Sequence, residues 1–154
     1  MSKRIPLTTS LPEAYQQLLA LNTSVEKAAA NAGLDPKLVE LVKIRASQLN
    51  GCAFCLDMHT HDTLKQGEDE RRIFVLPAWR ETELYTEQER AALALTEAIT
   101  KLAATQDVPD DVYEAAMAVF TEEQVVTVVW AATVINAFNR LSVTARKPLP
   151  KVKR

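Results

Sequence analysis

Residues 35–66 read DPKLVELVKIRASQLNGCAFCLDMHTHDTLKQ, and this stretch predicts two helices that meet at a sharp corner. Asp35 followed by Pro36 is a typical helix start, because aspartate can cap the first turn and proline is tolerated there. Apolar residues then recur at helical spacing. Gly51 interrupts this pattern, and glycine is the residue that most readily ends a helix. We therefore expect one helix over about 36–50 and a second over about 52–66.

The rest of the chain has the same helical character. Only three of the 154 residues are glycine, and strong helix formers such as alanine, leucine and glutamate dominate. Three further helix starts are marked by possible capping boxes, at Ser10 with Glu13, Thr86 with Glu89 and Thr121 with Gln124. These signals predict an all-α fold of six or seven helices, at about 11–32, 36–50, 52–66, 69–76, 87–105, 110–118 and 122–145.

The length fits one domain over residues 1–154, with a core at about 11–145 and a basic tail at 146–154. The segment 122–145 is apolar on nearly every face, which is typical of a helix buried all round. A chain this small offers little protein to cover such a helix. We therefore expect a homo-oligomer in which a subunit interface supplies part of the burial.

Charge and hydropathy exclude several classes of partner. The net charge of −2 gives no field that would gather nucleic acid or an anionic membrane, and we interpret the basic tail as a frayed, solvated end. The N-terminal MSKRIPLTTS has no apolar run typical of a secretory signal. The longest apolar stretch, 125–138, contains polar residues and is too short to span a bilayer. We expect a cytoplasmic protein that binds neither nucleic acid nor membrane.

Both cysteines and both histidines of the chain lie within ten residues of one another, as Cys52, Cys55, His59 and His61. On a helix, Cys52, Cys55 and His59 share one face. The chain is long enough to bury a core without a disulfide to support it. A close cysteine pair in a reducing compartment is more often catalytic or metal-binding than structural.

The arrangement of these side chains suits redox chemistry. Gly51 places Cys52 near a helix N-terminus, where the free N–H groups favour a thiolate. His59 can lower the pKa of Cys55 or accept its proton. The three-residue spacing also lets the two sulfurs close a disulfide. One thiol could therefore be oxidised by a substrate while the other resolves it, and the residues alone leave open which is attacked first.

Zinc binding is the main alternative for the same residues. Cys52, Cys55 and His59 would supply three ligands, and His61 or Asp62 a fourth. A structural zinc site usually draws its second ligand pair from a distant segment, and the rest of the chain has neither cysteine nor histidine. His61 falls on a different helix face and is interpreted as solvated. We therefore expect no metal.

Residues 41–60 resemble the core of the AhpD-like alkylhydroperoxidases, which belong to the carboxymuconolactone decarboxylase superfamily. Segments 76–82, 86–97 and 136–140 add to the resemblance, which covers most of 36–141. These proteins are all-helical dimers, trimers or hexamers that reduce hydroperoxides with a cysteine pair and no bound cofactor. The resemblance implies the same activity and the same fold here.

The resemblance also implies a role for each site residue. Cys55 matches the cysteine that attacks the peroxide, and Cys52 matches its partner, which donates a proton and then closes the disulfide. His59 matches a histidine that relays a proton, through water, to a glutamate that matches Glu40. From the residues alone, Glu40 would instead be exposed and paired with Lys43. The resemblance replaces that interpretation.

One departure from the family pattern bears on function. Phe54 stands where the best-studied members carry a second histidine between the cysteines. The alternative function is therefore a thiol–disulfide oxidoreductase or redox carrier with little peroxidase activity. In either case a dithiol or a protein thiol would re-reduce the pair. The decarboxylase branch lacks the cysteine pair, so the sequence speaks against lactone decarboxylation.

Overall fold

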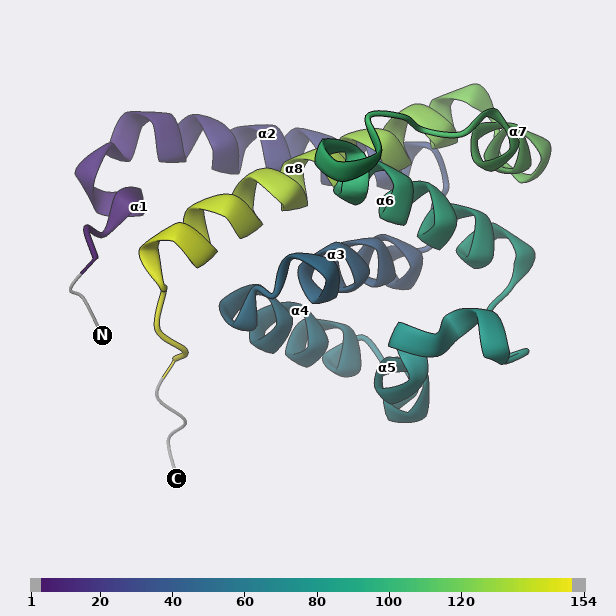
Figure 1. Ribbon diagram of the computed structural model, residues 1–154, viewed down its shortest axis with the longest axis horizontal. Coiled ribbons are helices and arrows are strands. Elements are labelled where there is room, and N and C mark those ends of the chain that lie inside the picture. The colour runs from purple at the N-terminus through teal and green to yellow at the C-terminus, as the bar shows by residue number, and fades with distance from the viewer. Residues whose placement is uncertain (1–3, 151–154) are drawn as a thin grey trace.

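Eight α-helices and one 3₁₀ helix make up the described part of the chain, residues 4–150 of a computed structural model (Figure 1). They are α1 (Leu7–Ser10), α2 (Pro12–Asn31), α3 (Pro36–Asn50), α4 (Ala53–Lys65), α5 (Glu70–Val75), η1 (Leu76–Glu81), α6 (Glu87–Thr105), α7 (Asp110–Val119) and α8 (Glu122–Ala145). The predicted all-α single domain is confirmed, and α2 to α8 lie close to the expected ranges.

The capping residues explain why most helix starts were predictable. The Asp35 side chain accepts from the backbone N–H of Lys37 at the start of α3. Both predicted capping boxes at the starts of α6 and α8 are present, with side-chain and backbone bonds in both directions. Capping is local chemistry over three or four residues, so the sequence is enough to specify it.

The helix prediction was wrong in its count and at one N-cap. The structure adds the short helix α1 and the 3₁₀ helix η1, so the count exceeds the six or seven expected. Ser10 does not cap α2: it ends α1, and its N–H donates to the Pro6 carbonyl. A capping residue needs extended backbone, which Ser10 does not have. Leu11 takes the cap position instead, without a side-chain bond.

Helix α3 is the centre of the fold. It packs against α4, α6 and α8, and Figure 1 shows it enclosed between these elements. Leu41, Ile44 and Ala46 on α3 are almost completely buried. Most side chains of α3 are therefore buried, and these include charged and polar ones.

Helix α8 is only partly buried within the single chain. Val126 and Trp130 have 55% and 47% of their surface exposed. By length and composition the 24-residue helix could cross a membrane, and half of the relevant stretch is buried inside the protein. The subunit interface expected on this helix stays a prediction.

The corner between α3 and α4 is fixed to α8 by buried amides. Gly51 adopts φ 64°, the left-handed conformation that ends a helix. The Asn50 side-chain amide donates to the side-chain oxygens of Asn136 and Asn139, both at 2.9 Å. Asn139 in turn donates to the Ser47 hydroxyl at 3.0 Å. These bonds hold the cysteine-bearing corner in one position relative to α8.

A second buried polar centre joins η1 to α3 and α6. The Glu97 carboxylate accepts from Arg45 Nε, Trp79 Nε1 and Arg80 Nη1, each at 2.8 Å. Burial raises the pKa of Glu97, but the bonds from Trp79, Arg80 and Arg45 outweigh it, so the pKa lies below its usual value. The carboxylate is therefore ionised and holds three elements together.

Replacing Glu97 with glutamine should destabilise the fold by about 3 kcal/mol at pH 7, because it leaves the largely buried Arg45 guanidinium without its ion-pair partner. Since the pKa of Glu97 is lowered on folding, its contribution is present above pH ~4.5 and is lost as pH falls through the folded value. Urea unfolding at several pH values measures both effects. The exposed control Glu83→Gln should stay within about 0.5 kcal/mol. A Glu97→Gln deficit that is equal at neutral and acid pH would contradict this account.

Candidate active site

The two cysteines occupy the first turn of α4. Cys52 is the N-cap residue, and its sulfur accepts from the Cys55 backbone N–H at 3.3 Å. The sulfurs of Cys52 and Cys55 are joined as a disulfide, with the Cα atoms 5.4 Å apart. Only 1% of Cys52 and 2% of Cys55 is exposed. The corner thus presents a redox pair that is shielded from bulk solvent.

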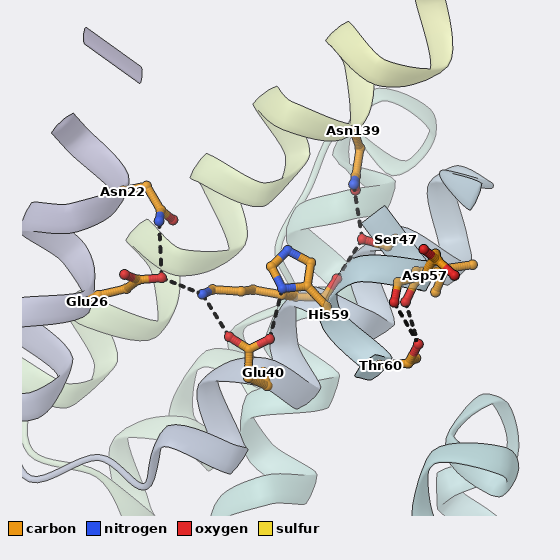
Figure 2. Close-up of polar contacts among 10 residues, drawn as sticks. Asn22, Glu26, Glu40, Ser47, Asp57, His59, Thr60 and Asn139 are labelled. Atoms are coloured by element: carbon orange, nitrogen blue, oxygen red, sulfur yellow. Dashed lines mark hydrogen bonds and ion pairs between the residues drawn. The ribbon is translucent and has the colours of Figure 1, made fainter. Parts of the chain in front are cut away.

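His59 lies one turn after Cys55 on α4 and bonds to a carboxylate from α3. Its Nδ1 atom is 2.8 Å from Glu40 Oε2 (Figure 2). An ionised carboxylate can only accept, so Nδ1 carries the proton. Nε2 is then the ring nitrogen that can take a proton in the neutral imidazole. The structure therefore brings Glu40 and His59 together in the geometry of a base and its orienting group.

Glu40 is buried, with 8% of its surface exposed, so the interpretation of an exposed Glu40 is wrong. Its ion pair with Lys43 does exist, since Lys43 Nζ lies 2.9 Å from Glu40 Oε1. Lys43 Nζ also lies 2.8 Å from Glu26 Oε1 on α2. The four side chains form one chain of polar contacts, Glu26–Lys43–Glu40–His59 (Figure 2).

The sequence did not predict two features of this polar network: the burial of Lys43 and the contact that Glu26 makes with it. The spacing between Glu40 and Lys43 indicated their pairing, but not that both charges are inside the protein. Glu26 carried no signal, because it lies on another helix and its partner is 17 positions away. Asn22, one turn before it, donates to the same Glu26 oxygen at 3.0 Å. The series of polar contacts that begins at His59 therefore ends on α2.

The charges in the chain stabilise one another. Burial raises the pKa of Glu40, but the hydrogen bond from His59 and the charge of Lys43 outweigh it and bring the pKa below its usual value. Burial lowers the pKa of Lys43, but Glu40 and Glu26 outweigh it and raise the pKa. Both groups are therefore ionised near neutral pH, and Glu40 is fixed as an acceptor for His59.

A cavity of about 760 Å³ opens onto these groups. Cys55, His59, Glu40 and Lys43 lie on its wall, together with apolar side chains from α2, α4 and α8: Tyr15, Leu19, Phe54, Met58, Ile135 and Phe138. Its size is that of a small-molecule site with an apolar lining and a few polar groups. The cavity gives an organic substrate access to Cys55 and His59 together.

The start of the basic tail is ordered beside the cysteines, which corrects the interpretation of a frayed end for its first residues. Arg146 ends α8 in the left-handed conformation, and the Lys147 N–H donates to the Ser142 carbonyl at 2.9 Å. The Lys147 ammonium lies 3.7 Å from the centre of the Phe54 ring. A cation thus covers one of the two residues that lie between the cysteines. Residues 151–154 of the tail lie outside the described part.

His61 is exposed on α4, as the sequence indicated. Within residues 4–150, no group of three histidine, cysteine, aspartate or glutamate side chains is placed to hold a metal ion. The zinc alternative needs Cys52 and Cys55 as thiolates, and the structure joins them as a disulfide. The expectation that the chain binds no metal stays a prediction.

Comparison with known proteins identifies the family of the chain. The sequence model of the carboxymuconolactone decarboxylase family matches residues 10–98, which include the cysteine corner and Glu40. The chain belongs to the carboxymuconolactone decarboxylase family. The predicted resemblance to this family, within the AhpD-like superfamily, is thereby confirmed.

Similar proteins include relatives and solved structures of this family and fold. The uncharacterized protein YdfG of Bacillus subtilis (strain 168) is 41% identical over 143 residues, covering 93% of this chain and 94% of YdfG. A crystal structure of a protein of unknown function from Agrobacterium tumefaciens, suggested to be the antioxidant defence protein AhpD, has a TM-score of 0.88 and 39% identity, covering 97% of this chain and 99% of that one. The debrominase Bmp8 has a TM-score of 0.80 at 16% identity, covering 93% and 74%, which shows a shared fold alone.

Replacing Lys43 with methionine should raise the pKa of Glu40 by about one unit, because a buried carboxylate loses its ion-pair partner. Carbon NMR titration of the glutamate carboxyls, assigned with Glu40→Gln, measures the change directly. Glu26→Gln should not raise the pKa of Glu40, because Lys43 then has Glu40 as its remaining ion-pair partner. Lys27→Met, an exposed change on α2, is the control. A Glu40 titration unchanged in Lys43→Met would refute the electrostatic coupling.

Proposed function

We propose that this family member reduces organic hydroperoxides with the Cys52–Cys55 pair. The observation that carries the proposal is the bond of His59 Nδ1 to the buried Glu40 carboxylate, which leaves Nε2 as a base in the cavity that Cys55 also lines. Catalysis by a thiol needs such a base beside a nucleophile and a third group that orients the base. Family membership and the likeness to a suggested AhpD protein support the same activity.

The proposed cycle starts with the reduced pair. His59 accepts the proton of Cys55, and the thiolate attacks the terminal oxygen of the hydroperoxide. The O–O bond breaks, Cys55 becomes a sulfenic acid, and the leaving alkoxide takes a proton and departs as an alcohol. The Cys52 thiol then attacks the Cys55 sulfur, a disulfide forms and water leaves. A dithiol or a protein thiol reduces the disulfide by exchange.

The contribution that His59 must make to lowering the pKa of Cys55 can be bounded. An unperturbed cysteine has a pKa near 8.5, so only a few per cent of it is thiolate at pH 7. A helix N-terminus typically contributes under about 1 kcal/mol towards the thiolate. Lowering a pKa by two units needs about 2.7 kcal/mol. The remainder falls to His59, which Glu40 holds in place.

A second candidate function is thiol–disulfide exchange with little peroxidase activity. Phe54 between the cysteines favours it, because a phenylalanine cannot carry a proton as a histidine there would. The substrate would then be a disulfide rather than a peroxide. Peroxide consumption in the presence of a dithiol separates the two functions, because an exchange protein would reduce disulfides without consuming peroxide.

Replacing His59 with alanine should slow hydroperoxide consumption by about 100-fold, the usual contribution of a positioned base. His61→Ala is the matched control on the same helix, because His61 is exposed and bonds to none of the described residues; its rate should stay within about twofold of wild type. The assay follows peroxide loss with dithiothreitol as reductant. Equal rates for the two variants would remove His59 from the mechanism.

The assignment of Cys55 as the attacking cysteine has a test of its own. After one equivalent of an organic hydroperoxide, Cys52→Ser should carry a sulfenic acid at Cys55, because Cys55 retains its base and has lost its resolving partner. Cys55→Ser should carry much less. Trapping with dimedone and mass spectrometry measures both. A sulfenic acid found only at Cys52 would reverse the two roles.

A further inference from the structure

The two cysteines lie on the walls of two different cavities. Cys55 lines the 760 Å³ cavity that also contains His59 and Glu40. Cys52 lines a second cavity of about 440 Å³ between the start of α4 and the end of α8. Phe54, Ser142 and Lys147 belong to both walls and so form the partition between them. Figure 1 shows the end of α8 on the same side of the molecule as the start of α4.

The second cavity differs from the first in its charge. The wall of the first cavity carries both signs of charge, with three carboxylates (Glu26, Glu40 and Asp62) and three lysines (Lys43, Lys65 and Lys147). The wall of the second carries Arg146 and Lys147 and, within the described part of the chain, no carboxylate. A neighbouring cavity at the same end adds Arg4, again without a carboxylate among its described lining residues. This is a basic region on a protein whose net charge is −2.

The Lys147 ammonium is the cation nearest to the partition. It rests on the Phe54 ring, and no carboxylate among residues 4–150 lies within ion-pair distance of it. Partial burial lowers the pKa of Lys147. A half-buried cation without a protein counter-ion gains from a bound anion, because the anion replaces water lost on burial.

We propose that the second cavity is the access route of the electron donor, and that the donor is a small thiol bearing a carboxylate. The volume of about 440 Å³ suits a small molecule. Arg146 and Lys147 would hold the carboxylate and favour the thiolate form of the donor. The inference builds on the proposed redox role of the cysteine pair and adds the class of reductant and its point of attack.

The chemistry of exchange fits attack at Cys52. The donor thiolate forms a bond to Cys52 Sγ, the Cys52–Cys55 bond breaks, and Cys55 leaves as a thiolate with the electron pair. Exchange is faster when the leaving thiolate is the better stabilised of the two sulfurs. Cys55 leaves as a thiolate into the cavity that also holds His59. A second donor thiolate then attacks the mixed disulfide, releasing the donor disulfide and the Cys52 thiolate.

The test compares two donors that share one thiol but differ in charge. Oxidised protein is reduced by N-acetylcysteine or by its neutral amide, at equal thiolate concentration and low ionic strength, with no peroxide present. Wild type should react about three- to tenfold faster with the anionic donor, and the preference should fall as salt is added. Arg146→Gln with Lys147→Met should reduce the preference to about one.

A charge-matched control removes two cations elsewhere. Lys27→Met with Arg71→Gln changes exposed residues of α2 and α5, which lie outside both cavity walls, and should keep the wild-type preference. The site of attack is identified by quenching the first exchange with iodoacetamide. Mass spectrometry should find the donor on Cys52 and the alkyl group on Cys55.

Three results would overturn the proposal: equal rates for the two donors in wild type, a preference that survives in Arg146→Gln with Lys147→Met, or the donor attached to Cys55. Because peroxide is absent, the outcome is independent of the peroxidase assay. If the protein consumes no peroxide but shows the charge preference, only the proposed peroxide substrate is refuted. If it consumes peroxide without the charge preference, only the proposed donor site is refuted.

Discussion

The site depends on the buried carboxylate of Glu40. An ionised carboxylate inside a protein is costly unless charges and hydrogen bonds compensate it. Here Lys43 and His59 each bond to one of its two oxygens, and the same Lys43 ammonium also pairs with Glu26. The same contacts that stabilise the buried charge also fix the tautomer of His59. The same contacts therefore serve both the stability of the fold and the orientation of His59. They form only when α2, α3 and α4 pack together.

Much of the fold was predictable because its signals are local. The caps at Asp35, Thr86 and Thr121 and the left-handed Gly51 are set by a few neighbouring residues, and the structure agrees with each. Ser10 shows the limit of this reasoning. It has the right partner three residues later, but a preceding helix already holds its backbone. A local pattern indicates which structure a segment can form. Whether the segment forms it also depends on the structure of the residues before it.

The candidate site was predictable only where its residues share a helix. Cys52, Cys55 and His59 follow from spacing on α4, whereas the link from Glu40 to His59 crosses between helices and rested on resemblance. Glu26 and Lys147 carried no pattern at all, because helix packing brings them to the site from 17 and 93 positions away from the residues they contact. The sequence shows that a residue is charged, but only the packing of the helices shows which groups it contacts.

Phe54 links the two proposals about the cysteines. A histidine between the cysteines would offer the Cys52 side a proton carrier, and phenylalanine does not. The Phe54 ring instead supports the Lys147 ammonium, so this side of the pair has a fixed charge rather than a titrating base. A fixed cation attracts a thiolate but does not deprotonate a thiol. In the proposed cycle, the base therefore serves Cys55 and its peroxide, while the cations serve Cys52 and a donor that arrives already ionised. A disulfide of two identical residues thereby acquires two chemically different ends.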